Sequence, residues 1–410
     1  MSIQAAPRDQ TDAVLRPPPQ FSRDQLMNFE FATAPRIVFG RGRLKEVGTI
    51  ARSFGASALV ITGSSANRAA RLLDELRANN LGVSTFCIPG EPTLDRIAEG
   101  VKFLETARRD LVIGFGGGSA IDAGKAIAAL AVNKGHVLDY VEVIGRGKPL
   151  QQPSVPLIAI PTTAGAGAEA TRNAVLTSVE HRVKVSLRGL SLLPRVALVD
   201  PELCQDLPPA LTASTGLDAL TQLIEPYVSA RANPFTDPLC LAGIGRVARS
   251  LRRAFECGSD ATAREDMAFA SLLGGVALAN AGLGAVHGFA SPIGGMFPAP
   301  HGVVCAALLP DVMEANLRAL RSRAPASELL RRYETIAGTL TDDERATADD
   351  GVAWVRDVCR ALAIPGLSAF GVTREDVPLI VERAVKASSM KSNPIVLTPD
   401  ELSEILVAAL

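Results

Sequence analysis

Residues 110–126 have the sequence DLVIGFGGGSAIDAGKA, which indicates a buried strand, a glycine-rich turn and the start of a helix. Glycines let a backbone approach a ligand without an intervening Cβ, and a helix N-terminus attracts anions. Asp122 and Lys125 lie three residues apart, so they share one face of this helix. We therefore predict a cradle for the pyrophosphate of a dinucleotide, with Asp122 nearby. The spacing matches neither G-x-G-x-x-G nor the P-loop, so a structural turn without a ligand is the alternative.

The chain around this stretch alternates apolar segments with helical ones. The predicted strands are 29–39, 58–62, 83–88, 111–115, 157–161 and 195–200, and the predicted helices are 67–78, 94–107 and one from 119. This alternation indicates a parallel sheet covered on both faces. Residues 161–175 add a second loop of small and hydroxyl-bearing residues after a strand, where ligands of such sheets bind.

Beyond about residue 207 the apolar residues recur with helical spacing. Predicted helices are 211–230, 237–257, 261–281, 304–324, 326–340, 348–362, 373–387 and 399–410. We therefore predict a flexible extension at 1–27, an α/β dinucleotide-binding domain at 28–206 and an all-α domain at 207–410.

The composition excludes several classes of protein. The 410 residues carry a net charge of −1 and only 4% aromatic residues, which argues against a nucleic-acid partner. No apolar run is long enough to span a bilayer, so no membrane association is expected. The six cysteines form no C-x-x-C, which is typical of free thiols in a reducing cytoplasm.

A candidate metal site lies in the helical half. Two of the four histidines, His287 and His301, flank a segment whose glycines and prolines are expected to break a helix, so their imidazoles can converge. Asp218 and Gln222 lie four residues apart on one helix face among apolar neighbours, and a buried carboxylate needs a cation or hydrogen bonds. Core histidines and a capping role for Asp218 are the alternatives.

Four motifs together resemble the iron-containing alcohol dehydrogenases, over about residues 29–410. They are GGGSAIDAGKAIA at 116–128, PTTAGAGAEATRNAV at 161–175, GLDALTQLIEPYVSARANP at 216–234 and HGFASPIGGMFPAPHG at 287–302. The resemblance implies the dehydroquinate synthase-like fold, in which an α/β dinucleotide-binding domain precedes an all-α domain and the active site lies between them.

The resemblance also implies roles for individual residues. Those implied for the cofactor are Gly117, Gly118 and Ser119 at the pyrophosphate, with Thr162, Thr163, Asn173 and Lys184 as further contacts. Those implied for a divalent metal, Fe²⁺ or Zn²⁺, are Asp218, Gln222, His287 and His301. Asp218, His287 and His301 are accordingly the predicted catalytic residues.

The sequence departs from the family pattern at several of these positions. Gln222 and Ser291 replace histidines, and Ala166 and Ala168 replace hydroxyl residues. Gly63 stands where NAD-preferring members carry an aspartate, so a 2′-phosphate is not repelled there. Because Ser64, Ser65 and Arg68 follow it, either NAD or NADP is expected, with Gly63 and Ser64 at the adenosine ribose.

We therefore predict an NAD(P)-dependent oxidoreductase that interconverts a small-molecule alcohol and an aldehyde or ketone. A divalent metal is expected to act as the Lewis acid, and the chain is expected to form a homodimer or larger homo-oligomer. The alternatives are a metal-independent keto-acid reductase of the maleylacetate type, a lyase or cyclase like dehydroquinate synthase, and a non-catalytic dinucleotide-binding protein.

Overall fold

A six-stranded, all-parallel sheet forms the first half of the computed structural model, which describes residues 28–410. Its strand order is β1-β8-β5-β4-β2-β3. The strands are β1 (Ile37–Phe39), β2 (Ser57–Thr62), β3 (Gly82–Cys87), β4 (Leu111–Gly116), β5 (Leu157–Pro161) and β8 (Val196–Val199). The predicted parallel α/β half is confirmed, although the strand expected at 29–39 covers only its last three residues. The extension predicted at 1–27 lies outside the described residues.

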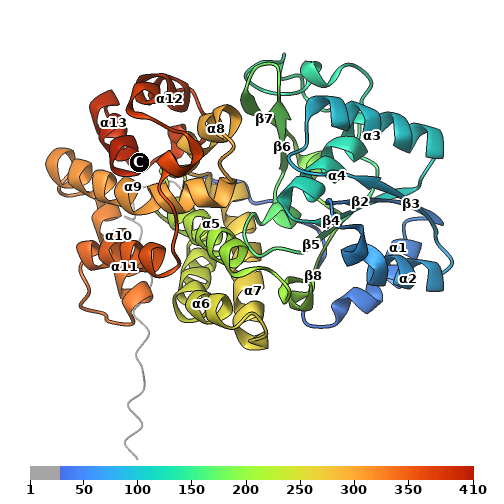
Figure 1. Ribbon diagram of the computed structural model, residues 1–410, viewed down its shortest axis with the longest axis horizontal. Helices are drawn as coiled ribbons and strands as arrows, with labels where there is room; N and C mark the ends of the chain where they lie inside the picture. Colours follow the sequence, from blue (N-terminus) through green and yellow to red (C-terminus); the bar gives the residue numbers. More distant parts are fainter. Residues whose placement is uncertain (1–27) are drawn as a thin grey trace, which may run out of the picture. The chain divides into compact units, whose positions relative to one another are not determined.

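Both faces of this sheet are buried beneath helices. Along β2, Leu59 and Ile61 belong to one apolar cluster while Ala58 and Val60 belong to another, because successive side chains of a strand point to opposite faces. Helices α3 (Leu94–Ala107) and α4 (Gly118–Leu130) cover the first face, and α1 (Val47–Arg52) and α2 (Ala70–Ala78) cover the second (Figure 1). These layers fix the carboxyl ends of the strands, including that of β4, which leads into the glycine turn.

A two-stranded antiparallel sheet, which the sequence analysis does not predict, follows β5. It pairs β6 (Asn173–Ser178) with β7 (Val183–Arg188). The burial of β6 alternates strictly between half-buried and buried residues, as expected of a strand with one covered face. This hairpin matters for the site because its first residue, Asn173, lines the main cavity.

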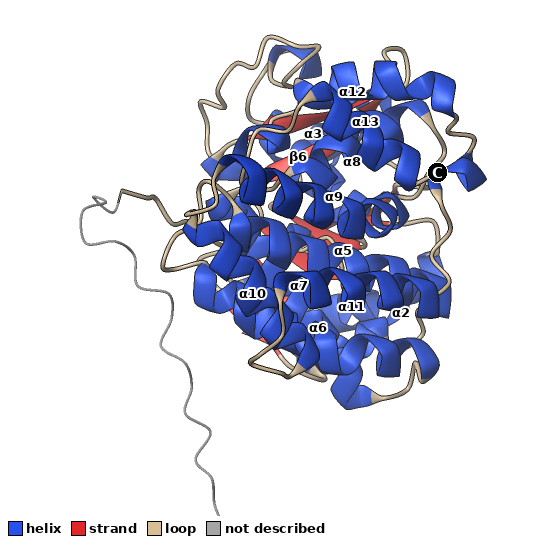
Figure 2. Ribbon diagram, turned by 90° about the vertical axis from the view of Figure 1, so that its left-hand side faces the viewer, coloured by secondary structure: helices blue, strands red, loops and turns tan. Residues whose placement is uncertain are grey.

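Helices make up the second half of the chain, as predicted. They are α5 (Pro209–Val228), α6 (Asp237–Glu256), α7 (Ala261–Ala281), α8 (Ala285–Met296), α9 (His301–Arg323), α10 (Glu328–Thr341), α11 (Ala348–Ala361), α12 (Val377–Val385) and α13 (Pro399–Ala408). Every strand of residues 28–410 ends by Val199, and Figure 2 looks onto these helices with the strands behind them. The predicted domain boundary falls between a short 3-10 helix, Pro201–Cys204, and α5.

Two details of the helical half bear on the predictions. The helix break expected within 287–302 is only partly right, because α8 continues through Pro292 and the break occupies 297–300. Among the described residues no single helix has the length and apolar character needed to cross a bilayer, although α7 and α8, bent by 100°, satisfy those criteria as a pair.

Candidate active site

The glycine turn joins the carboxyl end of β4, an interior strand of the sheet, to the start of α4. Gly116 has φ +154°, and a Cβ at this position would lie 2.7 Å from the Cβ of Ala120, so only glycine fits without a shift. Gly117 is the N-cap of α4 and has no side chain with which to cap the helix. The first amides of α4 therefore face the space beyond the turn, where an anion binds favourably.

The second loop packs directly against the first. The amide of Thr162 donates to the carbonyl of Gly116 over 2.9 Å. A Cβ on Gly117 would lie 3.4 Å from Thr163 Oγ1, and one on Gly118 would lie 3.0 Å from the Cβ of Ala166. The two loops thus form one surface, and side chains larger than glycine and alanine would fill the space between them.

Glu169 of this second loop is 2% exposed, and burial raises the pKa of its carboxyl from 4.5 to about 7. The folded-state pKa exceeds the unfolded one, so protonation contributes stability that is complete below about pH 4.5 and is lost as the pH rises through about 7. We expect Glu169→Gln to raise the free energy of unfolding by about 3 kcal/mol at pH 8 and by less than about 1 kcal/mol at pH 5. Urea unfolding at the two pH values measures this, and an equal effect at both would contradict it.

A cavity of about 470 Å³ connects the glycine turn with the helical half. Of the residues predicted to bind the cofactor, the cavity is lined by Gly117, Gly118, Ser119, Asp122, Thr163, Asn173 and Lys184. From the helical half it is lined by Asp218, Gln222, His287 and His301, the predicted metal residues. One continuous space therefore contacts both predicted sites.

Three predicted cofactor residues lie outside the lining of this cavity. Thr162 lies behind the glycine turn, to which its amide is bonded. Gly63 adjoins the turn, since a Cβ on Gly116 would lie 3.6 Å from the Gly63 nitrogen, and Ser64 is exposed. Arg68, expected near a 2′-phosphate, donates instead to the carbonyls of Leu203 and Thr162.

Asp122 and Lys125 hold the hairpin against α4. The Asp122 carboxylate accepts the Val175 amide over 3.0 Å and lies 3.4 Å from Lys125 Nζ. Lys125 also donates to Thr171 Oγ1 over 2.6 Å and to the Asn173 carbonyl over 2.9 Å. The structure thus gives Asp122 a clear positioning function at the wall of the cavity.

The three predicted catalytic residues meet at the other end of the cavity. Asp218 Oδ1 lies 3.5 Å from His287 Nε2 and 3.7 Å from His301 Nε2. Asp218 comes from the middle of α5, His287 from the first turn of α8 and His301 from the first residue of α9. Three segments that are distant in sequence therefore converge on one point.

Glu225, which the sequence analysis does not single out, fixes the ring of His287. Its Oε2 lies 2.6 Å from His287 Nδ1, and its Oε1 accepts the Val286 amide over 2.7 Å. Nδ1 therefore carries a proton donated to the carboxylate, and Nε2 is left facing Asp218. The only signal in the sequence is that Glu225 lies seven residues after Asp218, on the same face of α5.

Burial and mutual attraction shift the pKa values within this cluster. Burial alone would raise the pKa of Asp218, but His301 and His287 outweigh it and hold that pKa below its usual value. Burial alone would lower the pKa of His287, but attraction to the thiolate form of Cys305 and to the Glu225 carboxylate raises it well above its usual value. Such strongly perturbed groups in a cavity are typical of functional sites.

The donor atoms of the cluster fit a divalent metal ion. Asp218 and Gln222 are each 3% exposed, and neither Asp218 Oδ1 nor Gln222 Oε1 accepts a hydrogen bond from the described residues. Buried polar atoms without partners are rare in proteins and are typical of sites that bind an ion or a water molecule. A carboxylate with two imidazoles is a common ligand set for Zn²⁺ and Fe²⁺.

Comparisons with known proteins agree with this geometry. The family model "Iron-containing alcohol dehydrogenase" matches residues 34–201, and "Fe-containing alcohol dehydrogenase family, C-terminal" matches residues 212–410. Alcohol dehydrogenase 4 of Saccharomyces cerevisiae is 35% identical over 387 residues, covering 92% of this chain and 98% of the relative. The NAD-dependent methanol dehydrogenase of Bacillus methanolicus is also 35% identical over 387 residues, covering 93% of this chain and 99% of the relative.

The fold is similar to solved structures as well. A crystal structure of 1,3-propanediol oxidoreductase superposes with a TM-score of 0.87 at 33% sequence identity, covering 94% of this chain and all of that one (100%). Both halves of the chain, the order of its motifs and its three-dimensional structure lead to the same assignment. The protein is an oxidoreductase that belongs to the iron-containing alcohol dehydrogenase family.

Proposed function

We propose that this enzyme transfers a hydride reversibly between NAD(P) and a small alcohol or aldehyde. The reaction takes place within the cavity of about 470 Å³ that joins the two halves of the chain. One observation carries the proposal: the glycine turn and the Asp218–His287–His301 cluster line the same cavity. A nucleotide whose pyrophosphate lies at the turn would direct its nicotinamide toward the cluster. The substrate oxygen would then lie between the nicotinamide and the metal-binding residues.

The chain's own residues bind, orient and enclose the reactants. The amides at the start of α4 bind the pyrophosphate, and Lys184, whose Nζ is 2.9 Å from Glu91, places a cation in the cavity wall. Asp218, His287 and His301 hold a divalent metal, and Glu225 keeps His287 Nε2 free to ligate. When bound, the metal supplies a Lewis acid for the substrate oxygen, and the nicotinamide carries the hydride.

Removal and replacement of the metal test this proposal. Dialysis against a chelator is expected to abolish NAD(P)H oxidation with an aldehyde, and added Zn²⁺ or Fe²⁺ is expected to restore it. Nucleotide binding, measured by fluorescence, should survive chelation because the glycine turn contains none of the metal residues. Activity with a keto acid that is indifferent to chelation would instead favour the metal-independent reductase.

The choice of cofactor depends on Gly63 in this proposal. A Cβ on Gly63 would meet no heavy atom within 4 Å, so an aspartate fits there without strain. We expect Gly63→Asp to lower kcat/KM for NADP(H) relative to NAD(H) by about tenfold or more, because its carboxylate repels a 2′-phosphate and accepts ribose hydroxyls. Gly63→Ala is the control, since it adds the Cβ without the charge. Equal ratios in the two variants would contradict the assignment.

Two further predictions complete the proposed function. We expect a homodimer or larger homo-oligomer, which sedimentation of the purified protein measures. We also expect the enzyme to work in the cytoplasm, where its free cysteines stay reduced.

A further inference from the structure

A fourth potential ligand, Cys305, lies within the Asp218–His287–His301 cluster. Cys305 follows His301 by one turn of α9 and is 0% exposed. Its Sγ lies 3.7 Å from His301 Nε2 and 3.9 Å from His287 Nε2. Ligand atoms of all four residues lie within 4.8 Å of one another. The sequence analysis treats Cys305 as one of six free thiols, buried in a helical core, and the proposed reaction gives it no role.

The distances match the edges of a tetrahedral metal site. With zinc–nitrogen and zinc–oxygen bonds of about 2.0 Å and a zinc–sulfur bond of about 2.3 Å, neighbouring ligand atoms lie about 3.3 to 3.6 Å apart. The observed separations are 3.5 Å and 3.7 Å from Asp218 to the two histidines, and 3.7 Å and 3.9 Å from Cys305 to the same rings. These four separations exceed the expected edges by a few tenths of an ångström, and the other two pairs, Asp218–Cys305 and His287–His301, lie within 4.8 Å.

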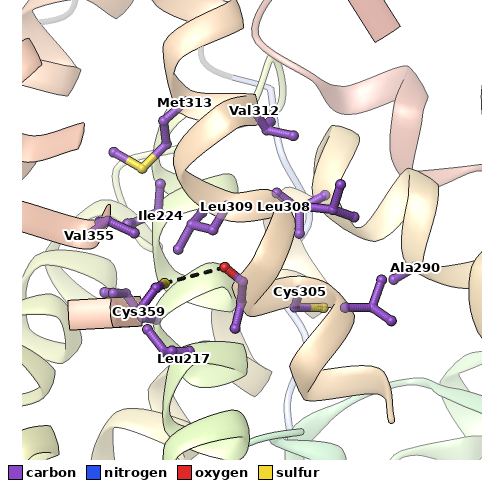
Figure 3. Packing of buried hydrophobic residues seen from close by; sticks show 14 of the residues in the cluster. Leu217, Ile224, Ala290, Cys305, Leu308, Leu309, Val312, Met313, Val355 and Cys359 are labelled. Atoms are coloured by element: carbon purple, nitrogen blue, oxygen red, sulfur yellow. Dashed lines mark hydrogen bonds between the residues drawn. The ribbon is translucent and has the colours of Figure 1, made fainter. Parts of the chain in front are cut away.

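Cys305 differs from other buried cysteines of this chain in what its sulfur faces. Cys359, also in the helical core, donates to the carbonyl of Ala306 over 3.4 Å, as Figure 3 shows. Cys240 is 0% exposed, and burial raises the pKa of its thiol. The Cys305 sulfur instead faces two imidazole nitrogens beside a carboxylate oxygen that accepts no hydrogen bond.

Charge balance favours Cys305 over Gln222 as the fourth ligand. A buried divalent cation needs compensating negative charge, and among the candidate ligand atoms the Asp218 carboxylate supplies only one. A thiolate at Cys305 would place a second negative charge directly on the ion, whereas the Gln222 amide adds none. A thiolate is also a soft ligand, which favours Zn²⁺ over harder ions such as Mn²⁺ and Mg²⁺.

We propose that Cys305 Sγ is a fourth protein ligand of the divalent ion held by Asp218, His287 and His301, and that the site consequently prefers Zn²⁺ over harder ions such as Mn²⁺ and Mg²⁺. On binding, a metal–sulfur bond forms and the thiol proton is released to solvent. Catalytic zinc sites can expand to five ligands, so a thiolate at Cys305 would still leave the ion able to polarise the substrate oxygen. The inference rests on the proposed function, because it concerns the same metal.

Cobalt substitution tests the inference without measuring activity. We expect the Co²⁺-loaded protein to show a sulfur-to-cobalt charge-transfer band in the near ultraviolet. Cys305→Ser should lose this band and weaken Zn²⁺ binding, measured by chelator competition, by at least about 100-fold, because even residues that only support a ligand contribute 10- to 100-fold. Cys359→Ser is the matched control and should retain the band, since its hydroxyl can still donate to Ala306.

A second measurement keeps the inference falsifiable if Cys305→Ser fails to fold. X-ray absorption at the zinc edge of the unsubstituted protein should show one sulfur at about 2.3 Å. Co²⁺ or Zn²⁺ bound with no sulfur ligand would overturn the inference and leave the proposed function standing. If the unsubstituted protein bound divalent ions no better than the Asp218→Asn variant does, the metal-dependent function would be overturned and this inference with it.

Discussion

Replacing His287 with alanine is expected to lower kcat/KM for aldehyde reduction by about 10³-fold or more, because a catalytic metal contributes several kcal/mol to the transition state. The imidazole is 8% exposed, with Nδ1 bonded to Glu225 and Nε2 facing Asp218. Its loss would remove a proposed metal ligand and leave the two buried carboxylates, Asp218 and Glu225, without their shared partner. Steady-state oxidation of NAD(P)H measures the effect.

The same variant should bind nucleotide as the unsubstituted enzyme does, because the glycine turn comes from β4 and α4. His136→Ala is the control, since His136 is exposed and lies outside the lining of the main cavity. A His287→Ala protein that still turns over would exclude the metal-dependent mechanism. A variant that loses nucleotide binding as well would show that His287 supports the whole cavity.

The sequence predicts best those elements whose ends carry chemical signals. The bounds predicted for α3 and α7 agree with the structure residue for residue. Each of these helices begins after a capping side chain, Thr93 or Asp260, that accepts an amide of the first turn, and α7 ends at Gly282 with φ +75°. Local chemistry of this kind acts without help from the rest of the chain.

Tertiary packing explains why the helix break predicted within 287–302 begins only after Met296. Proline removes a backbone donor and normally interrupts a helix, yet Pro292 lies inside α8. Phe289 and Ile293 on the same helix are both 0% exposed within the helical core. Their burial outweighs the lost hydrogen bond, and no local pattern reveals how deeply a segment will be buried.

The hairpin β6–β7 is missed because its turn lacks the usual residues. Two-residue hairpin turns favour asparagine or glycine, which adopt positive φ easily. Here the strands are joined by residues 179–182, and the left-handed position is occupied by Arg182 with φ +48°. A strained arginine leaves no turn signal in the sequence, so the wall of the cavity that this hairpin provides emerges only from the structure.

The site shows the same division between local and long-range information. The motifs name Asp218, His287 and His301, and the structure brings the three together. Glu225 and Cys305 are missed because their importance depends on which atoms they face, and helical spacing alone does not supply that direction. Cys305 lies one turn after His301, a spacing that places both on one helix face, but buried cysteines are common in helical cores.

The substitution Lys125→Met is expected to lower the free energy of unfolding by about 3–5 kcal/mol, because removing one partner of a buried ion pair has a cost of this size. Lys125 is 1% exposed, and the three donors of its ammonium group meet three acceptors: Asp122, Thr171 and the Asn173 carbonyl. Methionine retains the unbranched side chain up to the position of Cε and leaves all three acceptors without a cation. Urea unfolding measures the loss.

Lys386→Met is the control, because Lys386 pairs with Glu382 over 2.7 Å while the two side chains are 70% and 64% exposed. Surface pairs of this kind contribute less than about 1 kcal/mol. If Lys125→Met also lost less than about 1 kcal/mol, the buried pair would not hold the hairpin against α4.

A second substitution separates the charge of Asp122 from the hydrogen bonds of Lys125. In the Lys125→Met protein, Asp122 is buried at 9% exposure with the Val175 amide as its remaining bonded partner. Asp122→Asn removes that uncompensated charge, so the double variant should recover part of the stability lost. Without recovery, the loss would lie in the hydrogen bonds from Lys125 to the Thr171 hydroxyl and the Asn173 carbonyl instead. Nucleotide affinity should follow stability in this series, because Asp122, Thr171 and Asn173 all line the cavity in which we propose that the cofactor binds.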